Sequence, residues 1–261
     1  KVISFSKVKL VYTEHSTNNR RRKYSFFRYL DRFIYLKLNK IVAITNDVRV
    51  QLKDHLRFKD EIKVINNGIN IFPYQKSLNT NFSFFNKQDF KLIQVSSFRE
   101  QKDQLTLIKS LQYLPKDVKL ILVGDGILIE ESKKMVTTLK LWDRVVFLGN
   151  RYDIPELLKY SDVVVLSSHW EGFGLAIVEG MAAGKPVIAS KVKGIKEVVD
   201  KYGLLFNKGD AEELASLVNK LYENESLYQT YVNHSLARSK DFRIEKMVEQ
   251  YITQYNLLLN A

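Results

Sequence analysis

Two glutamates lie eight residues apart in a segment that otherwise looks like protein core, HWEGFGLAIVEGMAAGKPVIAS, residues 169–190. Glu171 precedes an apolar stretch of helical period, and Glu179 lies about one and a half turns inside it. A carboxylate only accepts hydrogen bonds and can bind two neighbouring hydroxyls, such as the vicinal diol of a sugar or a ribose. The pair therefore predicts a clamp, with one carboxylate for each sugar ring.

Two glycines and a lysine supply the complementary chemistry for an anion. Gly172 and Gly174 allow a ligand to approach the backbone closely, and a helix is expected from 174 to 183. The first N–H groups of this helix and its positive dipole end form an anion site. Lys102, in a loop expected to lie alongside, adds a point charge. Together these groups favour a diphosphate.

The elements that must position these groups alternate regularly from Asp89 onward. Short apolar runs, expected as strands, are separated by segments of helical period, and they lie at 91–97, 119–125, 144–150, 162–168, 185–190 and 203–206. Because the runs are apolar at nearly every position, they predict a parallel sheet covered on both faces in a doubly wound α/β domain. Ligands bind beyond the carboxyl ends of such strands, where the loops 96–103, 123–126, 149–151 and 169–174 lie.

The rest of the chain differs in pattern. Strands are expected within 9–15, 40–46 and 61–70, with an aromatic and basic helix at 24–38. A polar stretch, 71–89, reads as a connection. We therefore predict part of a first Rossmann-like domain at 1–70, a second domain at 71–240, and a final helix at 241–261 that packs back on the first part.

Composition excludes several classes of site. The chain of 261 residues contains no cysteine, which excludes disulfides and thiolate metal sites. It also contains no Asp-x-Asp triplet for Mg²⁺ or Mn²⁺, so we expect neither a metal nor another cofactor. No apolar run approaches the roughly 20 residues of a membrane-spanning helix, and no signal-peptide pattern is present. The expected location is the cytoplasm.

The net charge of +12 is concentrated near the start of the chain. Residues 1–60 hold 15 Lys and Arg but only 5 Asp and Glu, and the basic character peaks at 18–40. We interpret the helix at 24–38 as packing an apolar face on the core, formed by Phe26, Phe27, Leu30, Phe33, Ile34 and Leu38. The surrounding basic residues could still attract an anionic membrane surface and hold the protein at the inner face of the cell membrane. Nucleic acid is not an expected partner, because no recognition motif accompanies the charge.

Residues 171–190 resemble the signature of the retaining glycosyltransferases of family 4, which have the GT-B fold. In that signature a Glu is followed by seven residues and a second Glu, and only Gly180 replaces a usual alanine here. QKD at 101–103, LVGDG at 122–126 and NNGIN at 66–70 match further family landmarks in the same order. The resemblance implies two Rossmann-like domains facing across a cleft, with the nucleotide-sugar on the second.

The resemblance also implies roles for single residues. Glu179 would bind the ribose hydroxyls, Glu171 the hydroxyls of the donor sugar, and Lys102 the diphosphate, while His15 would lie near the anomeric centre. Lys102, Glu171 and His15 are thus the expected catalytic residues. The other expected substrate-binding residues are Ser97, Arg99, Gly124, Arg151, Gly172, Phe173, Gly174 and Leu175. The partners would be a UDP- or GDP-sugar and a saccharide or lipid-linked acceptor, in the synthesis of a cell-surface polysaccharide.

Two departures from the family pattern leave alternatives open. The arginine that the family commonly has five residues before the lysine is Ser97 here, and Arg99 follows two positions later. The family's N-terminal domain also extends well beyond the part matched here and includes a glycine-rich loop, so we expect a piece of a longer protein or a truncated copy. The alternatives are a nucleotide-sugar epimerase of the same fold and a binding module without transfer activity.

Overall fold

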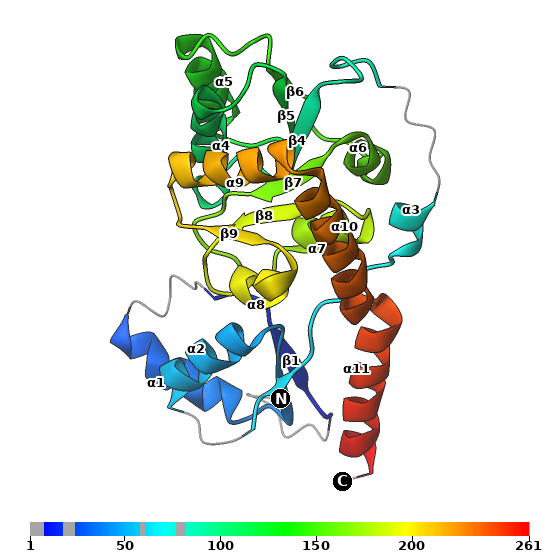
Figure 1. Ribbon diagram of the computed structural model, residues 1–261. Coiled ribbons are helices and arrows are strands. Elements are labelled where there is room, and N and C mark those ends of the chain that lie inside the picture. Colours follow the sequence, from blue (N-terminus) through cyan, green and yellow to red (C-terminus); the bar gives the residue numbers. More distant parts are fainter. Residues whose placement is uncertain (1–7, 18–23, 58–60, 77–81, 261) are drawn as a thin grey trace.

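The computed structural model describes residues 8–17, 24–57, 61–76 and 82–260, which form two α/β units (Figure 1). Each unit is built on a parallel sheet. The sheet of the first unit has the order β1-β2-β3, with strands at Val11–Glu14, Lys40–Ala43 and Lys63–Val64. The sheet of the second unit has the order β6-β5-β4-β7-β8-β9, with β4 to β9 at Phe90–Val95, Val118–Val123, Val145–Phe147, Val163–Leu166, Val187–Ser190 and Leu204–Phe206. The expected α/β fold and all six strands of the second sheet are confirmed.

The strand order of the second sheet determines where a ligand can bind. The chain builds outward from β4 in one direction through β5 and β6, then returns and builds in the other direction from β7. At such a switch point the loops after the two neighbouring strands diverge and leave a crevice. The loops after β4 and β7 are those that carry Lys102 and Glu171.

Both faces of the second sheet are buried, which accounts for its apolar strands. Ile93 and Val164 enter one hydrophobic core, whereas their neighbours Leu92 and Val163 enter the other. The first core also contains Ile44 and other residues of the first unit. The two units therefore share one continuous apolar core instead of meeting only through surface contacts.

Helices cover the second sheet in the expected alternation. They are α4 to α10 at Gln104–Ser110, Ile129–Thr138, Ile154–Tyr160, Leu175–Ala182, Ile195–Val199, Ala211–Glu223 and Glu225–Ser239, with short 3₁₀ turns η2 to η5 at Glu100–Lys102, Leu111–Tyr113, Asp200–Tyr202 and Lys240–Phe242. Helix α7 lies very close to β7. A Cβ added at Gly180 would lie 2.7 Å from Val164 Cγ2, which accounts for glycine where the family signature has alanine.

The first unit contains a helix that the sequence pattern did not predict, α2 at Asn46–Leu56. It begins where the hydroxyl of Thr45 accepts a hydrogen bond from the Val48 amide at 3.2 Å. Its buried apolar stripe is short, with Val48, Leu52 and Leu56 among mostly polar residues. A stripe of this length is weak evidence of a helix in sequence alone.

The core-packing interpretation of the aromatic helix is wrong for three of its residues. Helix α1, Ser25–Tyr35, leaves Phe26, Leu30 and Phe33 at 73%, 40% and 52% exposure. The inward face carries Asp31 instead, whose carboxylate is buried 3.0 Å from His55 Nε2 of α2. This buried hydrogen bond between α1 and α2 places Asp31 on the inward side of the helix and turns those three residues to the surface. Residues 18–23 of the basic segment lie outside the described residues.

The chain crosses between the two units twice. After β3 it passes through α3, Phe72–Gln75, within the stretch expected as a connection, and enters the second unit. After α10 it returns at a parallel bridge between Ile69 and Arg243, and α11, Ile244–Leu259, runs beside the first unit (Figure 1). Tyr251 of α11 shares a 2.9 Å hydrogen bond with Thr13 of β1.

In the part of the chain that the structure describes, no helix combines the length and the apolar character that crossing a membrane requires.

Candidate functional site

A pocket of about 330 Å³ opens at the switch point between β4 and β7. This volume falls in the range of small-molecule sites. The pocket brings together eight of the twelve residues predicted from the sequence: His15, Ser97, Lys102, Glu171, Gly172, Phe173, Gly174 and Leu175. The predicted residues Arg99, Gly124, Arg151 and Glu179 do not line it.

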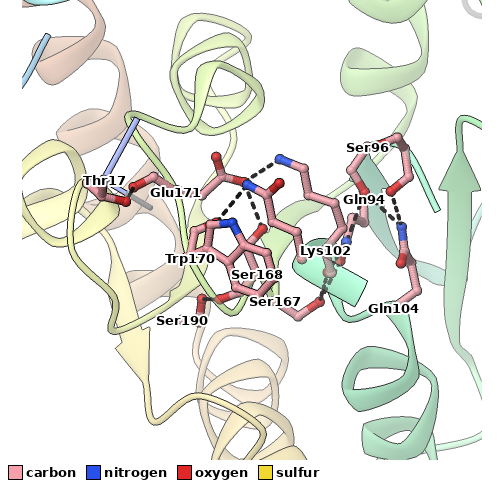
Figure 2. Close-up of polar contacts among 12 residues, drawn as sticks. Thr17, Gln94, Ser96, Lys102, Gln104, Ser167, Ser168, Trp170, Glu171 and Ser190 are labelled. Atoms are coloured by element: carbon pink, nitrogen blue, oxygen red, sulfur yellow. Dashed lines mark hydrogen bonds and ion pairs between the residues drawn. The ribbon is translucent and has the colours of Figure 1, made fainter. Parts of the chain in front are cut away.

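Lys102 and Glu171, which both line the pocket, form an ion pair (Figure 2). Lys102 ends η2 in the loop after β4, and Glu171 lies in the loop after β7. Glu171 is only 7% exposed and also accepts a hydrogen bond from Ser168 Oγ at 2.9 Å. These two donors satisfy the hydrogen-bonding capacity of a carboxylate that is buried. The pair therefore places one fixed negative and one fixed positive charge side by side.

A set of hydrogen bonds joins the two loops that carry this pair. Ser167 Oγ donates to the carbonyl of Asp103 at 2.7 Å and is 2.9 Å from Gln94 Oε1 (Figure 2). The His169 amide donates to the Gln101 carbonyl at 2.7 Å. These bonds hold Lys102 and Glu171 at a set separation before any ligand binds. Such preorganisation is what an electrostatic site requires.

The start of α7 faces the same pocket. Gly174 has a φ of 87°, a left-handed conformation that favours glycine, and it turns the chain into the helix. The first intrahelical bond begins at the Ile177 amide, so the amides of Leu175 and Ala176 have no acceptor in the preceding turn. Both residues line the pocket. The side chain of Phe173 is buried against Phe242, so that residue offers its backbone.

The first unit contributes His15, Ile44 and Asn67 to the lining of the pocket. His15 follows β1 and is exposed. Gly172 approaches it so closely that an added Cβ would lie 2.0 Å from the His15 carbonyl oxygen. Residues 171–172, termed here the glutamate turn, are thus in direct backbone contact with the first unit.

Three predicted residues have other surroundings. Arg99 is exposed at the start of η2 and does not reach the pocket lining. Gly124 has a φ of 126° and packs its backbone on the loop after β4, where an added Cβ would lie 2.1 Å from the Ser96 carbonyl. Arg151 forms a bidentate pair with Asp153, at 2.8 and 2.5 Å, which lowers the pKa of that carboxyl.

Glu179, which is expected to bind a ribose, is half-buried and lies beside the hydroxyl of Tyr74, from α3. Burial raises the pKa of Glu179, and the neighbouring Tyr74 hydroxyl opposes that shift. Tyr74 comes from the stretch that the sequence marked only as a connection, so no sequence signal identified it.

Glu179→Gln is expected to raise the melting temperature, and to raise it more at about pH 8 than at about pH 4. The pKa of Glu179 is raised by burial, so its ionisation as pH increases destabilises the folded protein, whereas glutamine does not ionise. Calorimetric melting curves across this range measure the effect. Glu223→Gln, at an exposed position of α9, is the matched control. Its difference in melting temperature from wild type should not increase between about pH 4 and about pH 8. A difference between Glu179→Gln and wild type that is independent of pH would contradict the assignment.

Several lining residues were not predicted from the sequence. They are Ile44, Asn67, Val95, Ser96, Leu166 and Ala176. Asn67 belongs to the landmark 66–70, and Ser96 directly precedes the predicted Ser97, so both lie beside recognised signals. Within the segments that the structure describes, no cluster of three or more His, Cys, Asp or Glu could hold a metal ion.

Two relatives with described activities are similar to this chain in sequence. N-acetyl-alpha-D-glucosaminyl L-malate synthase of Bacillus anthracis is 36% identical over 169 residues, covering 63% of this chain and 44% of the relative. UDP-Gal:alpha-D-GlcNAc-diphosphoundecaprenol alpha-1,3-galactosyltransferase of Escherichia coli is 27% identical over 240 residues, covering 86% of this chain and 62% of the relative. The chain thus matches 44% and 62% of the length of these two relatives.

A solved structure and two family models also match this chain. HepE of Anabaena, crystallised with UDP and glucose, superposes with a TM-score of 0.87 at 28% identity, covering 95% of this chain and 71% of that one. Residues 2–71 match the family described as Glycosyltransferase Family 4, and residues 75–237 match Glycosyl transferases group 1. With the parallel sheets, the switch-point pocket and the paired Lys102 and Glu171 in place, the chain belongs to the glycosyl transferases group 1 family and has the GT-B fold.

Proposed function

We propose that this chain carries the donor site of a glycosyltransferase that moves a sugar from a nucleoside diphosphate to a saccharide or lipid-linked acceptor, with retention of configuration. The observation that carries the proposal is the ion pair of Lys102 and Glu171 beside the start of α7, in one pocket with His15. The Escherichia coli relative is named for a UDP-sugar donor and a lipid-diphosphate-linked acceptor, and HepE was solved with UDP and glucose.

In this proposal each group has one role toward the donor. The diphosphate binds at the backbone amides of Leu175 and Ala176 and at the ammonium group of Lys102. Because this ammonium group has three N–H donors, it can contact a phosphate and keep its ion pair with Glu171. Glu171 accepts hydrogen bonds from the sugar hydroxyls, and Glu179 from the ribose once its contact with Tyr74 opens. His15 lies on the acceptor side, near the anomeric carbon.

The chemical step breaks the bond between the anomeric carbon and the phosphate oxygen while the acceptor oxygen attacks from the same face. The acceptor proton passes to the departing phosphate, and no protein nucleophile is required. Negative charge grows on the phosphate in the transition state, where the α7 amides and Lys102 stabilise it. In this proposal the groups that stabilise the phosphate all belong to the protein, and neither a metal nor another cofactor takes part. We place the reaction in the cytoplasm, in the synthesis of a cell-surface polysaccharide.

A thermal-shift screen of UDP-, GDP- and ADP-sugars, followed by transfer and donor-hydrolysis assays, tests the proposal. A ligand that binds only the folded protein stabilises it by about 2.7 kcal/mol at about 100 times its Kd. One class of donor is expected to raise the melting temperature and to be turned over. Binding without any turnover would favour a nucleotide-sugar-binding module, and a change of sugar configuration without transfer would favour an epimerase. If no nucleotide-sugar shifts the melting temperature, the donor site itself is refuted.

A further inference from the structure

The glutamate turn is held from the first unit by two hydroxyl groups. Thr17 Oγ1 donates to the Glu171 carbonyl oxygen at 2.7 Å, and both residues are buried (Figure 2). Thr45 Oγ1 donates to the next carbonyl, that of Gly172, at 3.3 Å. Thr17 follows β1 and Thr45 follows β2, so two separate loops of the first unit bind two consecutive carbonyl groups of the second.

Backbone contacts limit the movement of the turn on its other sides. A Cβ added at Gly194 would lie 2.5 Å from the Glu171 carbonyl oxygen and 2.7 Å from that of Gly172. The Gly194 amide is itself bound by Asp47 Oδ2 of α2 at 2.8 Å. The peptide groups of the turn therefore have little room to rotate while the units are in this arrangement.

The side chain of Glu171 points away from these anchors and into the pocket. There it meets Ser168 at 2.9 Å and the ammonium group of Lys102 (Figure 2). The backbone of Glu171 is thus bound by one unit and its carboxylate is paired within the other. Because the orientation of a peptide group sets the direction of the adjoining Cα–Cβ bond, the Thr17 hydrogen bond controls where this carboxylate lies.

We propose that Thr17 is a positioning residue that couples the arrangement of the two units to the grip of Glu171 on the donor sugar. The inference rests on the proposed function, because it takes Glu171 as the sugar-binding carboxylate. Thr17 is a better probe than Thr45, since the Thr45 hydroxyl also caps α2 through the Val48 amide. No contact of Thr17 with substrate is required.

Thr17→Val keeps the shape of the side chain and removes its donor, and Thr17→Ser keeps the donor. Calorimetric titrations would use UDP-glucose, GDP-glucose and ADP-glucose, each beside its nucleoside diphosphate. Thr17→Val is expected to weaken binding of the nucleotide-sugar by about tenfold, as for the loss of one hydrogen bond. Binding of the nucleoside diphosphate should change by less than about twofold. Thr17→Ser should restore wild-type values.

The matched control is Thr13→Val, which removes a hydrogen bond between β1 and Tyr251 that does not involve the glutamate turn and should leave sugar binding unchanged. Equal weakening of both ligands by Thr17→Val, or no weakening, would overturn the inference, as would failure of Thr17→Ser to restore binding. Glu171→Gln, measured in parallel, separates the two proposals. If it leaves nucleotide-sugar binding intact, or if wild type binds no nucleotide-sugar, the proposed function fails and the role of Thr17 fails with it.

Discussion

Replacing Lys102 with alanine is expected to slow sugar transfer by about 100-fold or more. The lysine lies in the switch-point pocket, paired with Glu171 and next to the start of α7. Its positive side chain lies where negative charge would grow on the leaving phosphate. Water that replaced the side chain would have to reorganise during the reaction, which raises the barrier. The measurements are kcat with the best donor, which should fall, and Kd for its nucleoside diphosphate, which should rise.

The same variant should also be less stable than wild type. Without Lys102, the buried carboxylate of Glu171 retains only the hydrogen bond from Ser168 among its described side-chain donors. An uncompensated buried charge destabilises a protein, so the double variant with Glu171→Gln should recover melting temperature but not activity. Lys109→Ala, on the exposed side of α4, is the control for loss of a lysine and should retain both. Wild-type turnover in Lys102→Ala would refute its role.

Gly172→Ala is expected to lower the free energy of unfolding by about 3 kcal/mol and to abolish activity. The new Cβ would lie 2.0 Å from the His15 carbonyl oxygen and 3.3 Å from Ile44 Cδ1. The nearer obstacle is backbone, so relief requires the glutamate turn and the loop after β1 to separate. That separation would also stretch the hydrogen bond between Thr17 and Glu171. Thermal unfolding and a transfer assay measure the two effects.

Gly209→Ala serves as the control for Gly172→Ala. Nothing lies within 4 Å of the position of its added Cβ, although its φ of 80° makes alanine mildly strained. It should therefore lose about 1 kcal/mol and keep its activity. A Gly172→Ala protein as stable and active as this control would show that the two units do not hold the close arrangement described.

The second unit could be predicted from sequence because its strands are buried on both faces. Residues such as Leu92 and Ile93 enter opposite cores, so the strands appear as nearly continuous apolar runs. The first unit carries weaker signals. Strand β3 has two residues, and α1 is rotated by a buried contact between Asp31 and His55, two residues that are 24 positions apart. No local period reports a contact of that kind.

The same distinction applies to the candidate site. Lys102 and Glu171 were recognisable because each lies in a loop after a strand, within a segment of distinctive composition. Thr17 binds a carbonyl 154 positions away, and Tyr74 reaches Glu179 from a stretch without any pattern. Such partners are set by how the units meet, which a single sequence does not encode locally. Arg151, to which the family resemblance assigns a substrate contact, forms a bidentate pair with Asp153 that the resemblance does not indicate.

The return of α11 to the first unit matters for anyone who exchanges parts between related enzymes. A gene cut after Ser239 keeps every strand of the second sheet but removes the helix that reaches Thr13 through Tyr251. A chimera that exchanges the first unit must therefore take two separate pieces, the segment before α3 and helix α11, from the same parent. If only the segment before α3 were exchanged, a foreign β1 would lie against the native α11, and the residues that contact each other between them would no longer match.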